Sequence, residues 1–294
     1  MARRRPRPYH DLRKAGWAAC APAGQRKCLP VVIDIHTHTR TPLSGSPEQE
    51  VALMKRCAAQ SGVDRVVHLF NVSETRQGPP DAGHIRANND WAMRLVERDP
   101  EFFSAFCYLN PANDPAFSLE EIERTVVYGN LVGVKLWAWV KATDPRLDPI
   151  MEKLAQIRAP LLFHSWYNQL GRTYDETTPA EIAVLARRYP GVTIVAAHMG
   201  GGGWRGVLDV KECPNVLVDT SGSQPGAALV EYAVRELGAE RILFGSDWPG
   251  RDMAVQKARV LGARISAEEK ALILGGNAAR LLGLRKEGKV GGRA

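Results

Sequence analysis

Short runs of apolar residues alternate with helical patterns along most of this chain. The apolar runs predict strands over residues 31–36, 64–70, 103–108, 131–137, 160–164, 192–198, 215–219 and 241–246. Most of these runs are rich in Val, Ile, Leu or Phe and lack a clean apolar–polar alternation, which is typical of strands that are buried on both faces. The pattern therefore predicts a parallel sheet that is covered by helices.

Helical patterns fill most of the intervals between the strands. They predict helices over 48–61, 86–99, 115–128, 148–158, 179–188 and 226–237, and after the last strand over 252–262, 267–275 and 277–283. Ser46, with Pro47 after it and Gln49 at the third helical position, predicts the start of the first helix, and Gly62 predicts its end. The interval 203–212 is short, and its helical pattern is weak.

Eight strands that alternate with helices over about 250 residues is the number expected of a (β/α)8 TIM barrel. An open, doubly wound α/β sheet is the alternative. The barrel is favoured because ligand-type side chains follow the first, fifth, sixth and eighth predicted strands, and the ends of all strands of a barrel meet at one mouth. Since no Pro/Gly/Ser-rich linker interrupts residues 31–284, we expect one TIM-barrel domain there.

The net charge of +7 belongs to the ends of the chain and not to this domain. Residues 1–30 hold eight Lys/Arg and one acid, while the other 264 residues hold 31 basic and 31 acidic residues. We expect residues 1–30 to be a basic, disordered tail or the product of an over-long start, with a targeting or interaction arm as the alternative. Residues 285–294 are expected to be a flexible C-terminal tail. The nearly neutral domain argues against nucleic-acid binding.

The sequence also bears on the compartment. No apolar run is long enough to span a membrane. The five cysteines are odd in number and show no paired metal-ligand spacing, which favours free thiols in a reducing cytoplasm. The sequence leaves the oligomeric state open, with a homo-oligomer as one option.

The first predicted strand ends in His36-Thr37-His38. Alternate residues of a strand point to the same side, so both imidazoles can reach one metal ion. His164, His198 and Asp247 each end another predicted strand, and a buried carboxylate such as Asp247 requires a cation or another partner nearby. Each residue alone is equally compatible with a solvated or hydrogen-bonded structural role. Together at one barrel mouth, the five predict a metal-dependent site.

These residues lie in the ordered motifs IDIHTH, LLFH, AAHMGG, LFGSDWP and GGNAARLLGL. In this set the chain resembles the amidohydrolase superfamily, in the branch called amidohydrolase-related or amidohydrolase 2, over residues 31–284. The resemblance implies a metal-bearing barrel in which His36, His38, His164 and Asp247 are the metal ligands. For His198 it implies either a contact with a second metal or a role in proton transfer or substrate binding.

Lys135, at the end of the fourth predicted strand, decides between one metal ion and two. Two-metal members of the superfamily can carry a carboxylated lysine at this point, which bridges the two ions. The other interpretation is a free ammonium that pairs with a substrate or protein carboxylate. We expect the free amine and therefore one divalent ion per chain, Zn²⁺, with a second ion against Lys135 and His198 if the lysine is carboxylated.

Aromatic and basic residues follow the same strands. Five of the seven tryptophans lie just beyond strands four, five, six and eight: Trp137, Trp139, Trp166, Trp204 and Trp248. They predict either an apolar pocket for an aromatic or cyclic substrate or anchors for the loops, and the sequence does not choose between these. Arg205 is one of several arginines beyond strand ends that are suited to hold a substrate carboxylate.

The first functional hypothesis is a metal-dependent hydrolase that cleaves a C–N or C–O bond in a small organic substrate, such as a cyclic amide or lactone, through a metal-activated water. Asp247 would take the proton from that water, and His198 would stabilise the oxyanion or assist proton transfer. The alternative is a non-oxidative, metal-dependent decarboxylase of an aromatic or unsaturated acid, with an arginine on the carboxylate. A non-catalytic scaffold on the same fold is the third possibility.

Overall fold

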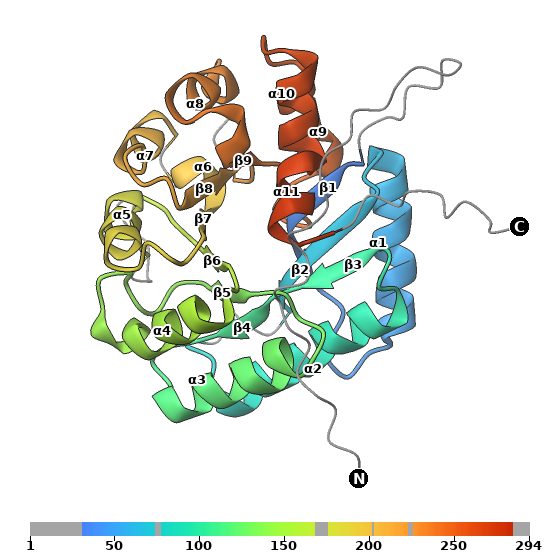
Figure 1. Cartoon of the computed structure of the whole chain (residues 1–294). Helices are drawn as coiled ribbons and strands as arrows, with labels where there is room; N and C mark the ends of the chain where they lie inside the picture. The colour runs from blue at the N-terminus through green and yellow to red at the C-terminus, as the bar shows by residue number, and fades with distance from the viewer. Residues whose placement is uncertain (1–30, 74–77, 168–175, 202, 223–225, 285–294) are drawn as a thin grey trace, which may run out of the picture.

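The computed structural model of this chain describes residues 31–73, 78–167, 176–201, 203–222 and 226–284. Strands occupy the middle of the molecule, and helices lie around them (Figure 1). The predicted tails, 1–30 and 285–294, lie outside the described residues.

The strands form two parallel sheets. The first consists of β1 (Ile33–Thr39), β2 (Arg65–Asn71) and β3 (Phe103–Ala105). The second contains, in chain order, β4 (Cys107–Leu109), β5 (Val134–Leu136), β6 (Leu161–Phe163), β7 (Ile194–Ala196), β8 (Val216–Asp219) and β9 (Ile242–Leu243). Nearly all of their side chains are buried, as the apolar runs predict.

Backbone hydrogen bonds connect the two sheets at both edges. Phe106 divides the predicted strand 103–108 into β3 and β4, and its N–H donates to the carbonyl of His68 over 3.0 Å. At the other edge, the N–H of Ile35 donates to the carbonyl of Phe244 (2.9 Å), and the N–H of Asp247 donates to the carbonyl of His36 (2.8 Å). The arrangement is the predicted TIM-barrel fold, with β1 beside the segment that follows β9.

The helices lie outside the strands, and most of them begin and end close to the predicted positions. They are α1 (Pro47–Ser61), α2 (Ala82–Arg98), α3 (Pro115–Ile122), α4 (Asp148–Ile157), α5 (Pro179–Arg188), α7 (Trp204–Asp209), α8 (Leu229–Leu237), α9 (Met253–Leu261), α10 (Ala267–Ala271) and α11 (Asn277–Leu281). As predicted, the side chain of Ser46 accepts a hydrogen bond from the Gln49 N–H, and Gly62 ends α1 in a left-handed conformation.

Three helix predictions need correction. Helix α2 begins four residues earlier than predicted because the carboxylate of Asp81 accepts the N–H of His84 over 2.8 Å and caps the first turn. The predicted helices 115–128 and 267–275 each change to a π-helical turn, over Glu123–Val127 and Leu272–Gly276. The short interval after β7 does contain a helix, α7. No helix among the described residues is long and apolar enough to cross a membrane.

Candidate metal centre

His36 and His38 lie on β1, which runs past the predicted end at residue 36 to Thr39. Thr37 between them faces away, since its hydroxyl donates to the carbonyl of Val67 on β2 over 2.8 Å. Asp247 follows β9 on the same end of the barrel, and its N–H is bonded to the carbonyl of His36. The two strand ends therefore direct two imidazoles and one carboxylate to the same place.

The spacing of these three groups suits a metal ion. Oδ1 of Asp247 lies 3.6 Å from Nε2 of His36 and 3.4 Å from Nε2 of His38. Ligands at about 2.1 Å from an ion in a tetrahedral arrangement are separated by about 3.4 Å. The three donor atoms all lie within 4.8 Å of one another. The spacing of His36, His38 and Asp247 thus suits a single divalent ion.

The other ring nitrogen of each histidine has a hydrogen-bond partner. Nδ1 of His36 lies 2.8 Å from Oδ2 of Asp219, and Nδ1 of His38 lies 3.1 Å from the carbonyl of Phe70. Nε2 of His164 lies 2.8 Å from Oε1 of Glu176. Each of these oxygens accepts a hydrogen bond from the protonated nitrogen of the ring. The opposite ring nitrogen then keeps its lone pair, as in histidines that bind metal ions.

His164 reaches the cluster through His198. Its Nδ1 lies 3.0 Å from Nε2 of His198, and the ring centroid of His198 lies 4.9 Å from that of His36. Nδ1 is the nitrogen of His164 that Glu176 leaves free. The structure therefore brings all five predicted residues together, although His164 does not belong to the compact group of His36, His38 and Asp247.

The backbone turns sharply where His198 and Asp247 leave their strands. The predicted strand 192–198 ends at Ala196, and the short segment α6 (Ala197–Gly200) holds His198 and Met199 at φ values of 63° and 51°. Asp247 has a φ of 66°. Left-handed backbone at residues other than glycine costs free energy and is concentrated at functional sites. These turns direct both side chains to the barrel mouth.

Burial favours the neutral form of three histidines of the site, His38, His164 and His198. It lowers the pKa of His38 to about 4 and lowers the pKa of His164 and His198 as well. Burial alone would raise the pKa of Asp247, but the hydrogen bond to His38 and the nearby imidazoles outweigh it and hold that pKa below its ordinary value. Neutral imidazoles and an ionised carboxylate are the forms that bind metal ions.

Lys135 is the middle residue of β5 and is buried, with 1% of its surface exposed. Burial lowers the pKa of its ammonium to about 7, although the charges of Asp219 and Asp247 oppose this shift. Its Nζ lies 6.0 Å from the centre of the Phe70 ring. Within the described part of the chain, no carboxylate oxygen lies within 4.0 Å of Nζ as an ion pair. The amine of Lys135 is therefore close to its pKa near neutral pH, and an anion beside it would favour the charged form.

The predicted aromatic residues divide into two groups. Trp166 packs edge-on against His198 with the ring centroids 5.5 Å apart, and Trp137 lies 6.4 Å from His164. Trp204, in contrast, is half exposed and contacts Tyr232 on α8, and the structure does not bring it to the histidines. Trp248 packs partly buried against the core beside Asp247.

Arg205, the predicted carboxylate clamp, lies at the rim and not at the histidines. Its guanidinium lies 4.8 Å from the ring centre of Tyr167, which follows β6, and 4.0 Å from the carboxylate of Asp209. Its side chain is 74% exposed. A role in holding the substrate would require Arg205 to turn toward the site.

Sequence reasoning missed three polar residues of the site, namely Glu176, Asp219 and Ser221. Asp219 ends the predicted strand 215–219, so a buried acid at a strand end was a signal that could have found it. Ser221 follows two residues later and lies 2.9 Å from Nδ1 of His198. Glu176 lies in a loop twelve residues after His164, and no local pattern indicates that its carboxylate folds back onto that histidine.

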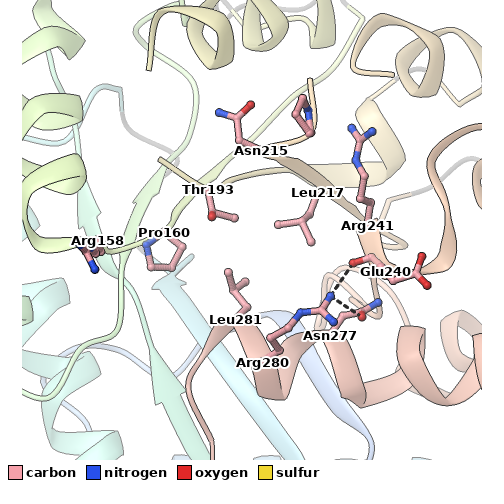
Figure 2. Close-up of a pocket in the computed structure, with 11 residues that line it drawn as sticks. Arg158, Pro160, Thr193, Asn215, Leu217, Glu240, Arg241, Asn277, Arg280 and Leu281 are labelled. Carbon is pink, nitrogen blue, oxygen red and sulfur yellow. Dashed lines mark hydrogen bonds between the residues drawn. The ribbon is translucent and has the colours of Figure 1, made fainter. Parts of the chain in front are cut away.

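A cavity lies at the other end of the barrel, and none of the five predicted residues lines it. Figure 2 shows the residues that line this cavity. It has a volume of about 400 Å³, and its lining includes Pro160, Thr193, Asn215 and Arg241, which precede β6, β7, β8 and β9. The guanidinium of Arg241 already donates to four backbone carbonyls. In barrels of this type, function is found at the carboxyl ends of the strands and stability at the amino ends, so this cavity is not the active site.

Gly222 provides the space that His198 occupies. It has a φ of 98°, and a Cβ at this position would lie 2.9 Å from Cβ of His198. Gly222→Ala should displace His198 and lower kcat on the order of 10²-fold, because reacting groups tolerate little displacement. The strained backbone should also cost about 1–3 kcal/mol, which lowers Tm by roughly 2–10 °C. Steady-state kinetics and a melting curve measure both effects.

Gly191→Ala is the matched control for this substitution. A Cβ on Gly191 would meet no heavy atom within 4 Å, so this variant should retain wild-type kcat and Tm. Wild-type kinetics in Gly222→Ala would contradict the close packing of Gly222 on His198.

A TIM barrel with histidines and a carboxylate gathered at the carboxyl ends of its strands defines a class of metal-dependent barrel enzymes. Comparison with protein families narrows this class. The Amidohydrolase family model matches residues 33–284, and the chain belongs to that family. This confirms the resemblance drawn from the motifs.

Curated relatives that the chain matches are gamma-resorcylate decarboxylases. The chain is 26% identical over 252 residues to the gamma-resorcylate decarboxylase of Rhodococcus jostii, covering 68% of this chain and 76% of the relative. Among solved structures, dihydroxybenzoic acid decarboxylase from Polaromonas with bound manganese and 2-nitroresorcinol matches with a TM-score of 0.70 and 21% identity, covering 87% of this chain and 98% of the other.

A further solved structure agrees with this fold. The 5-carboxyvanillate decarboxylase of Novosphingobium aromaticivorans, complexed with manganese, matches with a TM-score of 0.67 and 16% identity, covering 86% of this chain and 96% of the other.

The comparisons overturn the first functional hypothesis. The hydrolase prediction is wrong, because the curated relatives are gamma-resorcylate decarboxylases, and the alternative in the sequence analysis is the better supported reading. The reason for the error is physical. Hydrolysis and decarboxylation both use a divalent ion and a proton-transferring side chain, so the ligand motifs do not distinguish the two reactions.

Proposed function

We propose that this protein is a metal-dependent, non-oxidative decarboxylase of a hydroxylated aromatic acid. The similarity to gamma-resorcylate decarboxylases is the observation that carries the choice of reaction. The geometry supports it with a metal-type donor cluster, a histidine beside that cluster and a buried lysine close to Asp219 and Asp247.

His36, His38, His164 and Asp247 are the residues that would hold the metal in this proposal. Three imidazole nitrogens and one carboxylate oxygen suit a divalent transition ion. When bound, the ion would neutralise negative charge on the substrate oxygens and hold the ring in one orientation. One ion per chain follows if Lys135 is a free amine.

The identity of the ion belongs to the same proposal. A set dominated by imidazole is typical of zinc, whereas the solved decarboxylases named above hold manganese. Zinc remains our prediction from the donor set, and elemental analysis of protein purified without added metal tests it.

His198 is the proposed proton donor. Decarboxylation of an aromatic acid requires a proton at the ring carbon that bears the carboxylate. The proton on Nε2 of His198 would add to this carbon, the C–C bond would break to release carbon dioxide, and its electron pair would restore the aromatic ring. His198 is then neutral and regains a proton from solvent. A substrate carboxylate beside His198 favours the protonated imidazole that this step needs.

Lys135 and two tryptophans are the proposed substrate contacts. Lys135 is buried on β5, close enough to Asp219 and Asp247 to interact with their charges, and its ammonium would pair with a phenolate or carboxylate oxygen of the substrate. Trp137 and Trp166 lie next to His164 and His198, and their apolar rings would pack against an aromatic substrate. We extend the proposal to a cytoplasmic location, and we leave the oligomeric state to measurement.

The test is a substrate screen of the purified protein loaded with manganese or with zinc. We expect carbon dioxide to be released from 2,6-dihydroxybenzoate, 5-carboxyvanillate or a related hydroxylated benzoate, with the decarboxylated phenol as the product. Benzoate, which lacks a ring hydroxyl, is the matched control and should not react. Metal uptake without carbon dioxide from any aromatic acid would contradict the proposal, and absence of both uptake and turnover would favour a scaffold.

A further inference from the structure

Asp219 and Ser221, at the end of β8, contact two histidines of the site, and we call them the β8 polar pair. Oδ2 of Asp219 lies 2.8 Å from Nδ1 of His36. Oγ of Ser221 lies 2.9 Å from Nδ1 of His198 and 3.1 Å from Nδ1 of His36. Both residues of the pair are buried. The pair therefore joins a proposed metal ligand to the proposed proton donor.

The direction of each hydrogen bond follows from the donors around Asp219. Its Oδ1 accepts the backbone N–H groups of His198 and Ser221, each over 3.0 Å, and also a short hydrogen bond from the Ser221 hydroxyl. A backbone N–H can only donate, so Oδ1 acts as an acceptor. Because the hydroxyl proton of Ser221 points to Asp219, its Oγ is left to accept the Nδ1 proton of His198.

These hydrogen bonds determine which ring nitrogen of neutral His198 carries the proton. With the proton on Nδ1, the neutral ring has a lone pair on Nε2, which lies 3.0 Å from Nδ1 of His164. Nε2 of His164 is bonded to the carboxylate of Glu176, so Nδ1 of His164 also has a lone pair. Nδ1 of His198 is therefore held by Ser221, and Nε2 is the nitrogen that faces His164 and the rest of the site.

We propose that Ser221 is a positioning residue for proton transfer by His198, and that Asp219 links this function to the metal ligand His36. The inference rests on the proposed decarboxylation, in which His198 gives its Nε2 proton to the ring carbon. While Nδ1 stays bonded to Ser221, the ring cannot rotate, and only Nε2 exchanges its proton with the substrate. Without the hydroxyl, the ring can adopt the other tautomer and other orientations, which lowers the fraction that is ready for transfer.

Two substitutions separate the two members of the pair. Ser221→Ala should lower kcat by about 10- to 100-fold, the range for removing a side chain that orients a site histidine, while KM and metal content stay unchanged. Asp219→Asn should weaken metal binding by a similar factor as well, because it also holds His36. Ser118→Ala, which removes another buried serine hydroxyl on α3, is the matched control and should match wild type.

The decisive measurement is the tautomer of His198, observed by ¹⁵N NMR of the zinc-loaded protein without substrate. We expect a proton on Nδ1 in the wild type and in Ser118→Ala, and a mixture of tautomers in Ser221→Ala. A wild-type ring protonated on Nε2 instead would overturn the inference, and so would Ser221→Ala kinetics equal to those of Ser118→Ala. The NMR measurement needs no substrate. It therefore tests how the β8 polar pair orients His198 even if the decarboxylase assay fails.

Discussion

His198→Ala should abolish most turnover while the metal content stays near one ion per chain. A positioned general acid contributes about 10²- to 10⁴-fold, so we expect kcat to fall within that range. Nδ1 of His198 is bonded to Ser221 of the β8 polar pair, and the four proposed ligands are His36, His38, His164 and Asp247, although His198 also lies with His36 and Asp219 in a second group of possible donor atoms. Its removal should therefore leave metal binding intact. Elemental analysis and steady-state kinetics measure the two effects separately.

His164→Ala should give the opposite pattern and lose the metal itself. Removal of one of four protein ligands weakens the chelate and its geometry, and loss of the ion removes activity indirectly. Excess metal in the assay should recover part of the activity of His164→Ala but none of the activity lost in His198→Ala. His84→Ala, which changes a histidine of α2 outside the donor cluster, is the control and should resemble wild type.

Lys135→Ala decides whether this separation of roles is correct. If Lys135 is a free amine that binds the substrate, this variant should raise KM and keep one ion. Two ions in the wild type, with one lost in both Lys135→Ala and His198→Ala, would show that the lysine is carboxylated and that His198 is a ligand. That result would overturn the one-metal site.

Removal of the metal with a chelator should abolish carbon dioxide release and also lower the melting temperature. His36, His38 and Asp247 bring three donor groups within 4.8 Å of one another inside the barrel, and an ion that binds only the folded protein stabilises it. At a free metal concentration of 100 times Kd, this stabilisation is about 2.7 kcal/mol, which is roughly 5–10 °C in Tm for a domain of this size.

Adding back manganese or zinc should restore both turnover and Tm, and the Tm increase should be absent in His38→Ala. Magnesium, which prefers oxygen ligands, should restore less at the same concentration. Full activity in the chelated protein, with no metal detected, would contradict the proposed metal-dependent reaction even if the decarboxylation itself were observed.

The residue pattern by itself determined the barrel and the five strand-end residues. Strands buried on both faces need apolar residues at nearly every position, so a polar residue such as His164 or Asp247 at the end of such a run is conspicuous. The alternation of side chains along a strand placed His36 and His38 on one side without knowledge of the fold. These signals are local, and they remained valid in the structure.

The tertiary structure decided which groups surround these five residues. Glu176 contacts His164 from a loop. Asp219 at the end of β8 contacts His36, and Ser221 just after β8 contacts His198. The contact of Asp219 and that of Ser221 each join positions far apart in the chain, and Glu176 lies in a loop without a sequence pattern. It also placed Trp204 on Tyr232 and away from the histidines, because the direction of a side chain in a loop depends on what packs against it and not on its neighbours in sequence.

The choice between hydrolysis and decarboxylation required more than the ligand motifs. Both reactions need the same metal donors at the same strand ends, so the motifs that revealed the site carry no information on the bond that is broken. The reaction depends instead on the groups that receive the substrate and move its proton. The sequence therefore determined the barrel and its metal-type residues, whereas the hydrogen bonds that orient His36, His164 and His198 exist only in the folded chain, since they join side chains from different strands and loops.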